Sequence, residues 1–315
     1  MAISGSFDFT QNRSQIISNS FVEAGVLRPD ETPDSDESVF AAVQLNMMLK
    51  AWQADGLHVF ANRQATLFLE RDKTNYKLGA TGDHCTESFS TTAMRVAAVN
   101  TDTTLEVDTT TGMTAGDYIG VQIDDGTMHW TTIASVTDGD TLELTVGVDG
   151  AVAIDNVVYW YTTKIQRPLN VTNAYYRLSG SDSRMYEISK SDYMRLSTKT
   201  TESQPSQFYF DKQLTNTELN LYGEPNSVVG QVVMSLQFPF DDMDAATDNL
   251  AFPAEWLEAI HLGLAYRLAR SYRSKDPKTI ILKQDSEQAK YAVIGFDEER
   301  ADMDLHPDSR WLQDS

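Results

Sequence analysis

The chain has 315 residues and is poor in cysteine, in basic residues and in long apolar runs. Its single cysteine, Cys85, excludes an internal disulfide framework and a cluster of thiolate ligands. No apolar run reaches the roughly 18 residues of a membrane-spanning helix. The first residues also lack the basic start and apolar stretch of a signal peptide. We therefore expect a protein that functions without export and without a membrane.

The scarcity of basic residues gives the chain a strong negative charge. There are 25 Lys and Arg residues against 46 Asp and Glu, a formal net charge of −21. This balance argues against tight wrapping of nucleic acid, which requires neutralisation of phosphates. A channel that lets DNA pass should instead repel phosphates. The charge therefore fits either solubility alone or a DNA channel.

Sequence signatures of catalysis and of cofactor binding are also missing. The chain has no glycine-rich phosphate loop, no G-x-S-x-G elbow and no pair of histidines at zinc-ligand spacing. Asp83, His84 and Cys85 are neighbours in a predicted turn, where a nucleophile and its base seldom face each other. The acidic run at 241–244 lacks the alternation of a calcium loop and indicates a solvated loop. We expect no catalytic residue, no metal site and no cofactor.

Helical periodicity appears near both ends of the chain. Apolar spacing predicts a first helix around residues 16–22 and a stronger one at about 36–55. Pro253 and Pro277 each occupy the first turn of a further predicted helix, and the last helix extends to about residue 296. Gly25 is placed to end the first helix, and Gly56 to end the second.

The helix predicted at 36–55 carries apolar residues on two faces. One face holds Val39, Phe40, Val43 and Met47, and the other holds Leu45, Met48 and Trp52. A surface helix of a monomer needs only one apolar stripe, so two stripes predict burial on both sides. The helix lies either deep in a bundle or between a bundle and another subunit, and the sequence leaves both interpretations open.

Residues 88–163 differ in composition from the rest of the chain. They include one basic residue, Arg95, against 11 acidic ones, and they are rich in Thr, Val and Gly. Asp-Gly pairs supply the turn chemistry of hairpins. The predicted strands are 93–99, 104–107, 118–123, 129–136, 141–146 and 157–161. This pattern predicts an inserted all-β barrel or sandwich domain.

Further strand-like runs lie on both sides of this insert. They are 66–69 and 75–79 before it, and 170–178, 185–188, 207–210, 218–222 and 231–238 after it. The predicted fold class is α+β, a helical bundle with a β-sheet region. The predicted core is split into residues 1–87 and 164–296 around the insert at 88–163, and an extended tail follows at 297–315.

The tail at 297–315 has seven acidic residues, two arginines and no periodicity. Its only hydrophobic anchors are Met303, Leu305, Trp311 and Leu312. Acidic chain with sparse anchors is typical of a segment that folds on binding a partner.

Three arginines form a basic cluster near the end of the helix that follows Pro253. Arg267, Arg270 and Arg273 share one side of this helix, away from its apolar stripe. They can contact DNA phosphates in a channel, or they can stabilise the helix end and pair with acidic neighbours. The sequence does not decide between these roles.

Four segments, in the same order, resemble the head-to-tail adaptors of short-tailed bacteriophages. They are LNMMLKAWQADGLHVFANRQATLFL at 45–69, RPLNVTNAYYRL at 167–178, MYEISKSDYMRLSTKTTESQPSQFYFD at 185–211 with the following LNLYGEPNS, and FPAEWLEAIHLGLAYRLA at 252–269. The resemblance covers roughly residues 12–80 and 165–296. The insert departs from the minimal pattern of the family.

This resemblance implies a structural virion protein in the neck or tail, assembled in the host cytoplasm. Such adaptors form a homo-dodecameric ring below the portal protein. The ring continues the channel for double-stranded DNA, without specific binding, and carries the next tail component (a nozzle or tail tube) and in some cases tail fibres. The tail at 297–315 would then dock on the portal, and the insert would decorate the outer face of the ring.

Two other classes of function remain as alternatives. Trp130, Tyr159, Trp160 and Tyr161 are candidates for glycan or host-surface binding through the insert, although half of such a set should face its core. A cell-wall hydrolase would need a pair of carboxylates, and no pair is singled out among so many.

Overall fold

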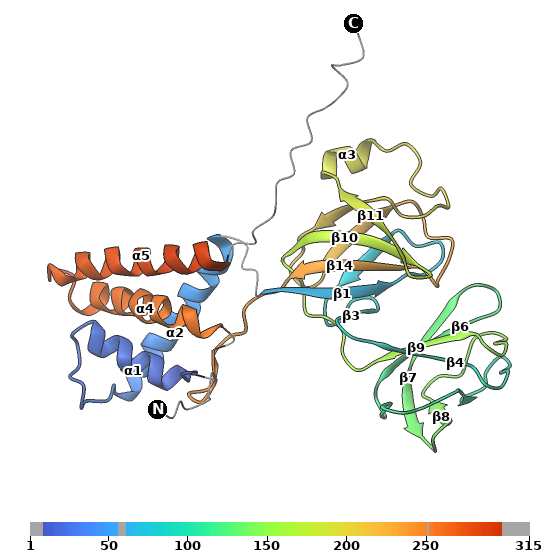
Figure 1. Cartoon of the computed structure of the whole chain (residues 1–315), viewed down its shortest axis with the longest axis horizontal. Helices are drawn as coiled ribbons and strands as arrows, with labels where there is room; N and C mark the ends of the chain where they lie inside the picture. The colour runs from blue at the N-terminus through green and yellow to red at the C-terminus, as the bar shows by residue number, and fades with distance from the viewer. Residues whose placement is uncertain (1–8, 56–60, 251, 298–315) are drawn as a thin grey trace, which may run out of the picture. The chain divides into compact units, whose positions relative to one another are not determined.

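The computed structural model describes residues 9–55, 61–250 and 252–297, and the chain forms two compact units. The first unit combines Met1–Phe60 with Phe240–Ser315, so its described helices come from the early and late parts of the chain (blue and orange-red in Figure 1). The second unit is Ala61–Pro239 and includes two β-sheets. The predicted α+β fold class is confirmed. The boundaries predicted near residues 87 and 163 fall inside the second unit.

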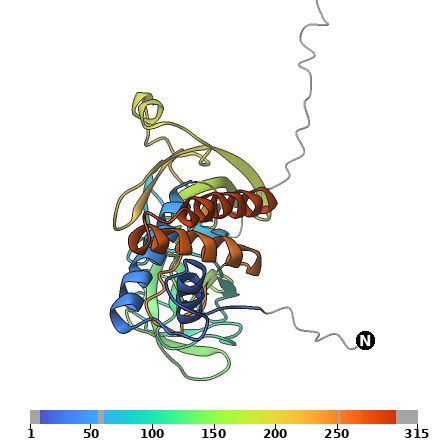
Figure 2. The ribbon, with the colours of Figure 1, turned by 90° about the vertical axis from the view of Figure 1, so that its left-hand side faces the viewer.

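The helices of the first unit surround one apolar core. They are α1 (Arg13–Glu23), α2 (Ser35–Asp55), α4 (Leu257–Tyr272) and α5 (Lys278–Asp297), with a 3-10 turn, η2 (Ala254–Trp256), before α4. Helix α4 contacts each of the other three helices, and Figures 1 and 2 both show α5 beside it. Because α4 lies at the centre of these contacts, it supplies much of the shared core.

Polar side chains fix where the helices of this unit begin and end. The Asn12 side chain accepts a hydrogen bond from the Gln15 backbone, and the Gln15 side chain accepts one from the Asn12 backbone, which forms a capping box at α1. Asp34 and Glu37 make the same reciprocal pair at the start of α2. Gly25 has φ +66° just after α1, a conformation that glycine adopts without strain.

An eight-stranded sheet forms one part of the second unit. Its strands are β1 (Asn62–Phe68), β2 (Asn75–Leu78), β3 (Cys85–Thr86), β10 (Asn170–Leu178), β11 (Ser181–Glu187), β12 (Gln207–Asp211), β13 (Thr217–Tyr222) and β14 (Gln231–Gln237). The order is β2-β13-β12-β11-β10-β14-β1-β3, and β11–β12 is the one parallel pair in it. The parallel pair needs a long crossover connection, which includes a short helix, α3 (Lys190–Arg195), that the sequence did not predict.

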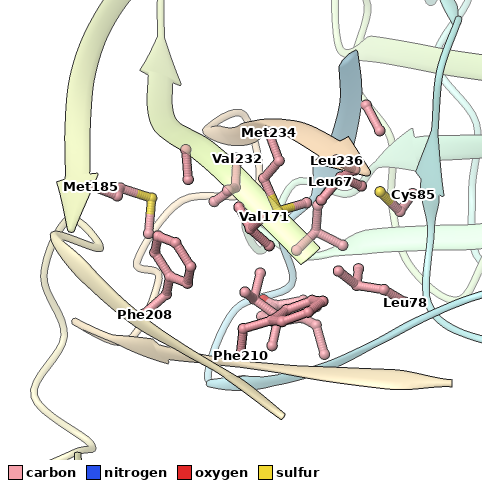
Figure 3. Close-up of a cluster of buried hydrophobic side chains, with 14 of the residues drawn as sticks. Leu67, Leu78, Cys85, Val171, Met185, Phe208, Phe210, Val232, Met234 and Leu236 are labelled. Atoms are coloured by element: carbon pink, nitrogen blue, oxygen red, sulfur yellow. The ribbon is translucent and has the colours of Figure 1, made fainter. Parts of the chain in front are cut away.

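The interior of this sheet is a single apolar cluster. Figure 3 shows Leu67, Val171 and Phe210, from three different strands, directed into a shared space. Strand β14 is buried along nearly its whole length between β1 and β10. The largely apolar sequence of β14 agrees with this central position. A strand that is buried on both faces does not need the alternation of apolar and polar residues seen in half-exposed strands.

The second sheet has six strands, and all of its pairs are antiparallel. They are β4 (Ser90–Ala93), β5 (Thr104–Glu106), β6 (Tyr118–Gln122), β7 (Met128–Val136), β8 (Thr141–Leu144) and β9 (Val157–Tyr161). The sheet order is β4-β9-β6-β7-β8-β5. The predicted Asp-Gly turn joins β6 to β7 through Gly126 at φ +86°. The strand predicted at 93–99 is wrong, because pairing with β9 ends at Ala93. Beyond it, only isolated bridges from Met94 to Val107 and from Ala98 to Val152 follow.

Candidate functional site

Helix α2 has one apolar face that completes the core of its own unit. Leu45, Met48, Leu49 and Trp52 are all buried there. The Trp52 ring lies 6.1 Å from that of Trp256, at the start of α4. This face therefore has its partner within the chain.

The opposite face of α2 is exposed. Val39, Val43 and Met47 retain 64%, 51% and 56% of their accessible surface. Their i, i+4, i+8 spacing places them in one row along the helix, which we call the α2 outer row. Phe40 lies between the two faces, half-buried, with its ring edge-on to Tyr272 at 6.0 Å. Burial of both faces within one chain, one of the two sequence interpretations, is wrong for the residues described.

A polar side of α2 holds the acidic loop that precedes α4. The Lys50 ammonium donates to the Phe240 carbonyl at 2.6 Å and pairs with Asp242 at 2.9 Å. The Asn46 side-chain oxygen accepts from the backbone N–H of Met243 at 3.2 Å, and the Met243 side chain is buried. The loop is therefore tied to α2. Across the described residues, no group of three or more His, Cys, Asp or Glu side chains is placed to hold a metal ion.

The three arginines of the predicted basic cluster have different environments. Arg273 donates to the Gly25 carbonyl at 2.8 Å and lies 3.8 Å from Asp276, so it serves the end of the helix. Arg270 is exposed. Arg267 is half-buried, and its pKa is lowered by burial and by the neighbouring charge of Arg270.

Asp83, His84 and Cys85 are adjacent but their side chains serve separate contacts. The Asp83 carboxylate accepts from the Lys73 ammonium at 2.8 Å. The His84 Nδ1 lies 2.6 Å from the Tyr161 hydroxyl. Cys85 is fully buried, and this burial raises the pKa of its thiol. A buried, protonated thiol does not act as a nucleophile.

The aromatic residues of the six-stranded sheet pack inward. Tyr159 and Tyr161 are buried against Phe68 of β1, and the Trp130 ring stacks on His84 at 3.9 Å between centroids. Burial within this cluster, together with the charge of Lys164, lowers the pKa of His84 to about 3. The sequence did not predict that Phe68 and His84 pack against the aromatic residues of the six-stranded sheet. A local sequence pattern does not reveal which distant segments meet.

This inward packing bears on the glycan-binding alternative. Trp160, the fourth aromatic candidate, is half-buried and packs against the interior of the six-stranded sheet. None of the four candidates is exposed, so they form no open aromatic platform. The four hydrophobic anchors of the tail, Met303 to Leu312, lie outside the described residues.

Among the described helices, none has the length and apolar content to span a membrane.

The chain matches no protein-family model and no curated protein. Among solved structures, it is similar to the Gp54 tailspike of Acinetobacter baumannii bacteriophage AP22, determined with a capsular saccharide, at TM-score 0.21 and 16% identity. That match covers 23% of this chain and only 14% of the tailspike. A second similarity is to VP17, a capsid protein of bacteriophage P23-77, at TM-score 0.12 and 8% identity, over 56% of this chain and 83% of VP17. Scores this low support no conclusion about fold or function.

Proposed function

We propose that this protein is a non-catalytic structural component of a tailed-phage virion, a head-to-tail adaptor that forms a ring below the portal protein. The observation that carries the proposal is the α2 outer row. Val39, Val43 and Met47 are exposed although the other face of the same helix completes a core. A row of apolar residues without an intramolecular partner is typical of a surface that another chain covers. The resemblance of four ordered segments to phage adaptors supports a second copy as that chain.

The size of the α2 outer row indicates how the ring assembles. Complete burial of one Val or Met side chain stabilises by roughly 1.5–3 kcal/mol. The three side chains are already about half covered, so a second copy adds on the order of 3 kcal/mol through this row, against an association cost of about 4–15 kcal/mol. The row alone does not hold two free chains together. We therefore expect the ring to form on a portal, which brings the copies to high local concentration.

The remaining partners follow from this position in the particle. The ring would continue the channel for double-stranded DNA and present a platform for the next tail component, with the protein located in the neck of the virion after assembly in the host cytoplasm. Residues 88–163 hold a net −10 of the total −21. If this segment decorates the outside, the repulsion of phosphates in the channel must come from acidic residues elsewhere in the chain.

The test is assembly on the portal of the phage that encodes the chain, measured by native mass spectrometry and electron microscopy. The wild-type chain should be monomeric alone and form a ring on the portal. Val43→Asp places a charge in the predicted contact and should abolish the closed ring. Val99→Asp is the matched control, because Val99 is 64% exposed in the six-stranded-sheet region of the other unit. Equal assembly of both variants would refute a role for the α2 outer row.

A further inference from the structure

A small pocket opens between α2, α4 and α5 of the first unit. Its volume is about 180 Å³, and Met48, Trp52 and Gly263 form its apolar part. Arg267 and Lys290 supply positive charge at the same pocket. The Lys290 ammonium lies 5.4 Å from the centroid of the Trp52 ring, in cation–π geometry. We call this cavity the Arg267 pocket.

The charge of Arg267 is not compensated by the residues around it. Its pKa is lowered by burial and by Arg270, with no carboxylate opposing this shift. Within the described part of the chain, its guanidinium makes neither an ion pair nor a hydrogen bond. Glu287, also at the pocket, lies 3.7 Å from Lys283 instead. The chain has 46 acidic and 25 basic residues, so carboxylates outnumber the basic side chains. A half-buried arginine without a carboxylate partner can be compensated by an anion that binds at the pocket.

The combination of an apolar floor and a cationic rim selects one class of ligand. A pocket of this size accepts a single side chain, and the positive charge of Arg267 favours a carboxylate beside it. Duplex DNA needs a broad basic surface that contacts many phosphates, which this pocket does not offer. The matching chemistry is an acidic peptide that carries a single apolar anchor.

Residues 298–315 of the chain have this chemistry. They contain six acidic residues against two arginines, and Met303, Leu305, Trp311 and Leu312 supply apolar anchors. Lys290 precedes the end of α5 by seven residues, which is roughly 10 Å of helix. Eighteen extended residues span up to about 60 Å, so the segment easily reaches back to the pocket. Attachment to α5 also gives it an effective concentration in the millimolar range, at which even a weak site is filled.

We infer that residues 298–315 dock in cis on the Arg267 pocket of the free protein, with an apolar anchor on Trp52 and acidic side chains on Arg267. The inference concerns the free chain and does not depend on ring formation. It adds a step to the proposed function, since a segment held in this way must leave the pocket before it can bind a portal.

Limited trypsin digestion of the full-length protein tests this docking, because Arg300 and Arg310 lie within the segment. Cleavage of a reversibly docked segment follows the fraction of time it is released. Loss of a charge-assisted contact should increase that fraction, so we expect Arg267→Glu to accelerate cleavage at both sites roughly tenfold or more. Arg267→Lys retains the charge and should stay close to the wild type. Arg28→Glu, at an exposed position of the same unit, makes the same charge change and should have no effect.

Two further measurements decide between outcomes. Circular dichroism must show that Arg267→Glu keeps its helices. The double variant Asp302→Asn, Asp304→Asn removes two acidic side chains of the segment and leaves the pocket unaltered. It too should accelerate cleavage. Wild-type cleavage as fast as that of a free peptide of residues 298–315 would overturn the inference. Protection that appears only as protein concentration rises would also overturn it, since the segment would then dock on a second copy. Ring formation on the portal is a separate readout, so either proposal can fail alone.

Discussion

Helices α2 and α4 share one core but differ in how fully their own unit covers them. Helix α4 is covered by its neighbours around most of its circumference, and its buried residues are Leu257, Ala259, Ile260, Gly263, Leu264, Ala265, Leu268 and Ala269. Helix α2 buries only one side, which includes Leu45 and Met48, and exposes Val39, Val43 and Met47 on the other. One buried stripe is sufficient to hold a helix in this unit, as α1 shows with Ile16, Ile17 and Phe21. The second stripe of α2 therefore contributes to something other than the fold of the single chain.

The largest expected effect comes from truncating the two faces of α2 separately. Leu45→Ala removes a fully buried side chain from the shared core and should lower the free energy of unfolding by about 3 kcal/mol. Val43→Ala, two residues away in the outer row, should change it by less than about 0.5 kcal/mol. Urea denaturation followed by circular dichroism measures both. A large loss of stability for Val43→Ala would mean that the outer row already has a partner within the chain.

Much of the secondary structure could be predicted because its pattern is local. The strands Val157–Tyr161 and Asn170–Leu178 were predicted at their observed bounds. Each is a run of apolar or alternating residues with turn-forming or polar residues on both sides. The strand expected at 93–99 was misplaced, because its residues suit a strand but find little pairing there. Strand pairing depends on segments distant in the sequence, and local propensity does not contain that information.

The candidate site shows the same limit. Periodicity revealed two apolar faces on α2, but it could not say which one meets α4. Likewise, the spacing of Arg267, Arg270 and Arg273 placed them on one helix side, whereas the Gly25 carbonyl that binds Arg273 lies far away in the sequence. A sequence pattern gives the direction of a side chain on its element, and the chain's other elements decide what the side chain meets.

A smaller effect is expected from the polar contact that ties α2 to the loop before α4. Asn46→Ala leaves the backbone N–H of Met243 without its acceptor, which should cost about 1–2 kcal/mol, reduced by the roughly 0.5 kcal/mol that alanine gains in a helix. Gln44→Ala is the matched control on the same helix and should be neutral or slightly stabilising. Amide hydrogen exchange at Met243 reports the contact directly. Unchanged exchange in Asn46→Ala would show that the loop does not depend on this contact and is held by Lys50 instead.

The smallest effect, and one that reverses sign between two sites, concerns how closely α2 approaches α4. A Cβ on Gly263 of α4 would lie 2.7 Å from the Met48 sulfur and 3.0 Å from the Trp52 ring, whereas a Cβ on Gly295 of α5 would meet nothing within 4 Å. Gly→Ala in a helix gains up to about 1 kcal/mol of propensity, and overpacking costs about 1–3 kcal/mol. Gly263→Ala should therefore destabilise by about 1 kcal/mol, because the Trp52 ring cannot yield as the flexible Met48 side chain can. Gly295→Ala should stabilise by a few tenths of a kcal/mol, since it lies near the end of its helix. If thermal unfolding shows both variants stabilised, Met48 and Trp52 pack less tightly against α4 than the distances at Gly263 indicate. The buried and exposed faces of α2 would then differ less in packing than the structure shows.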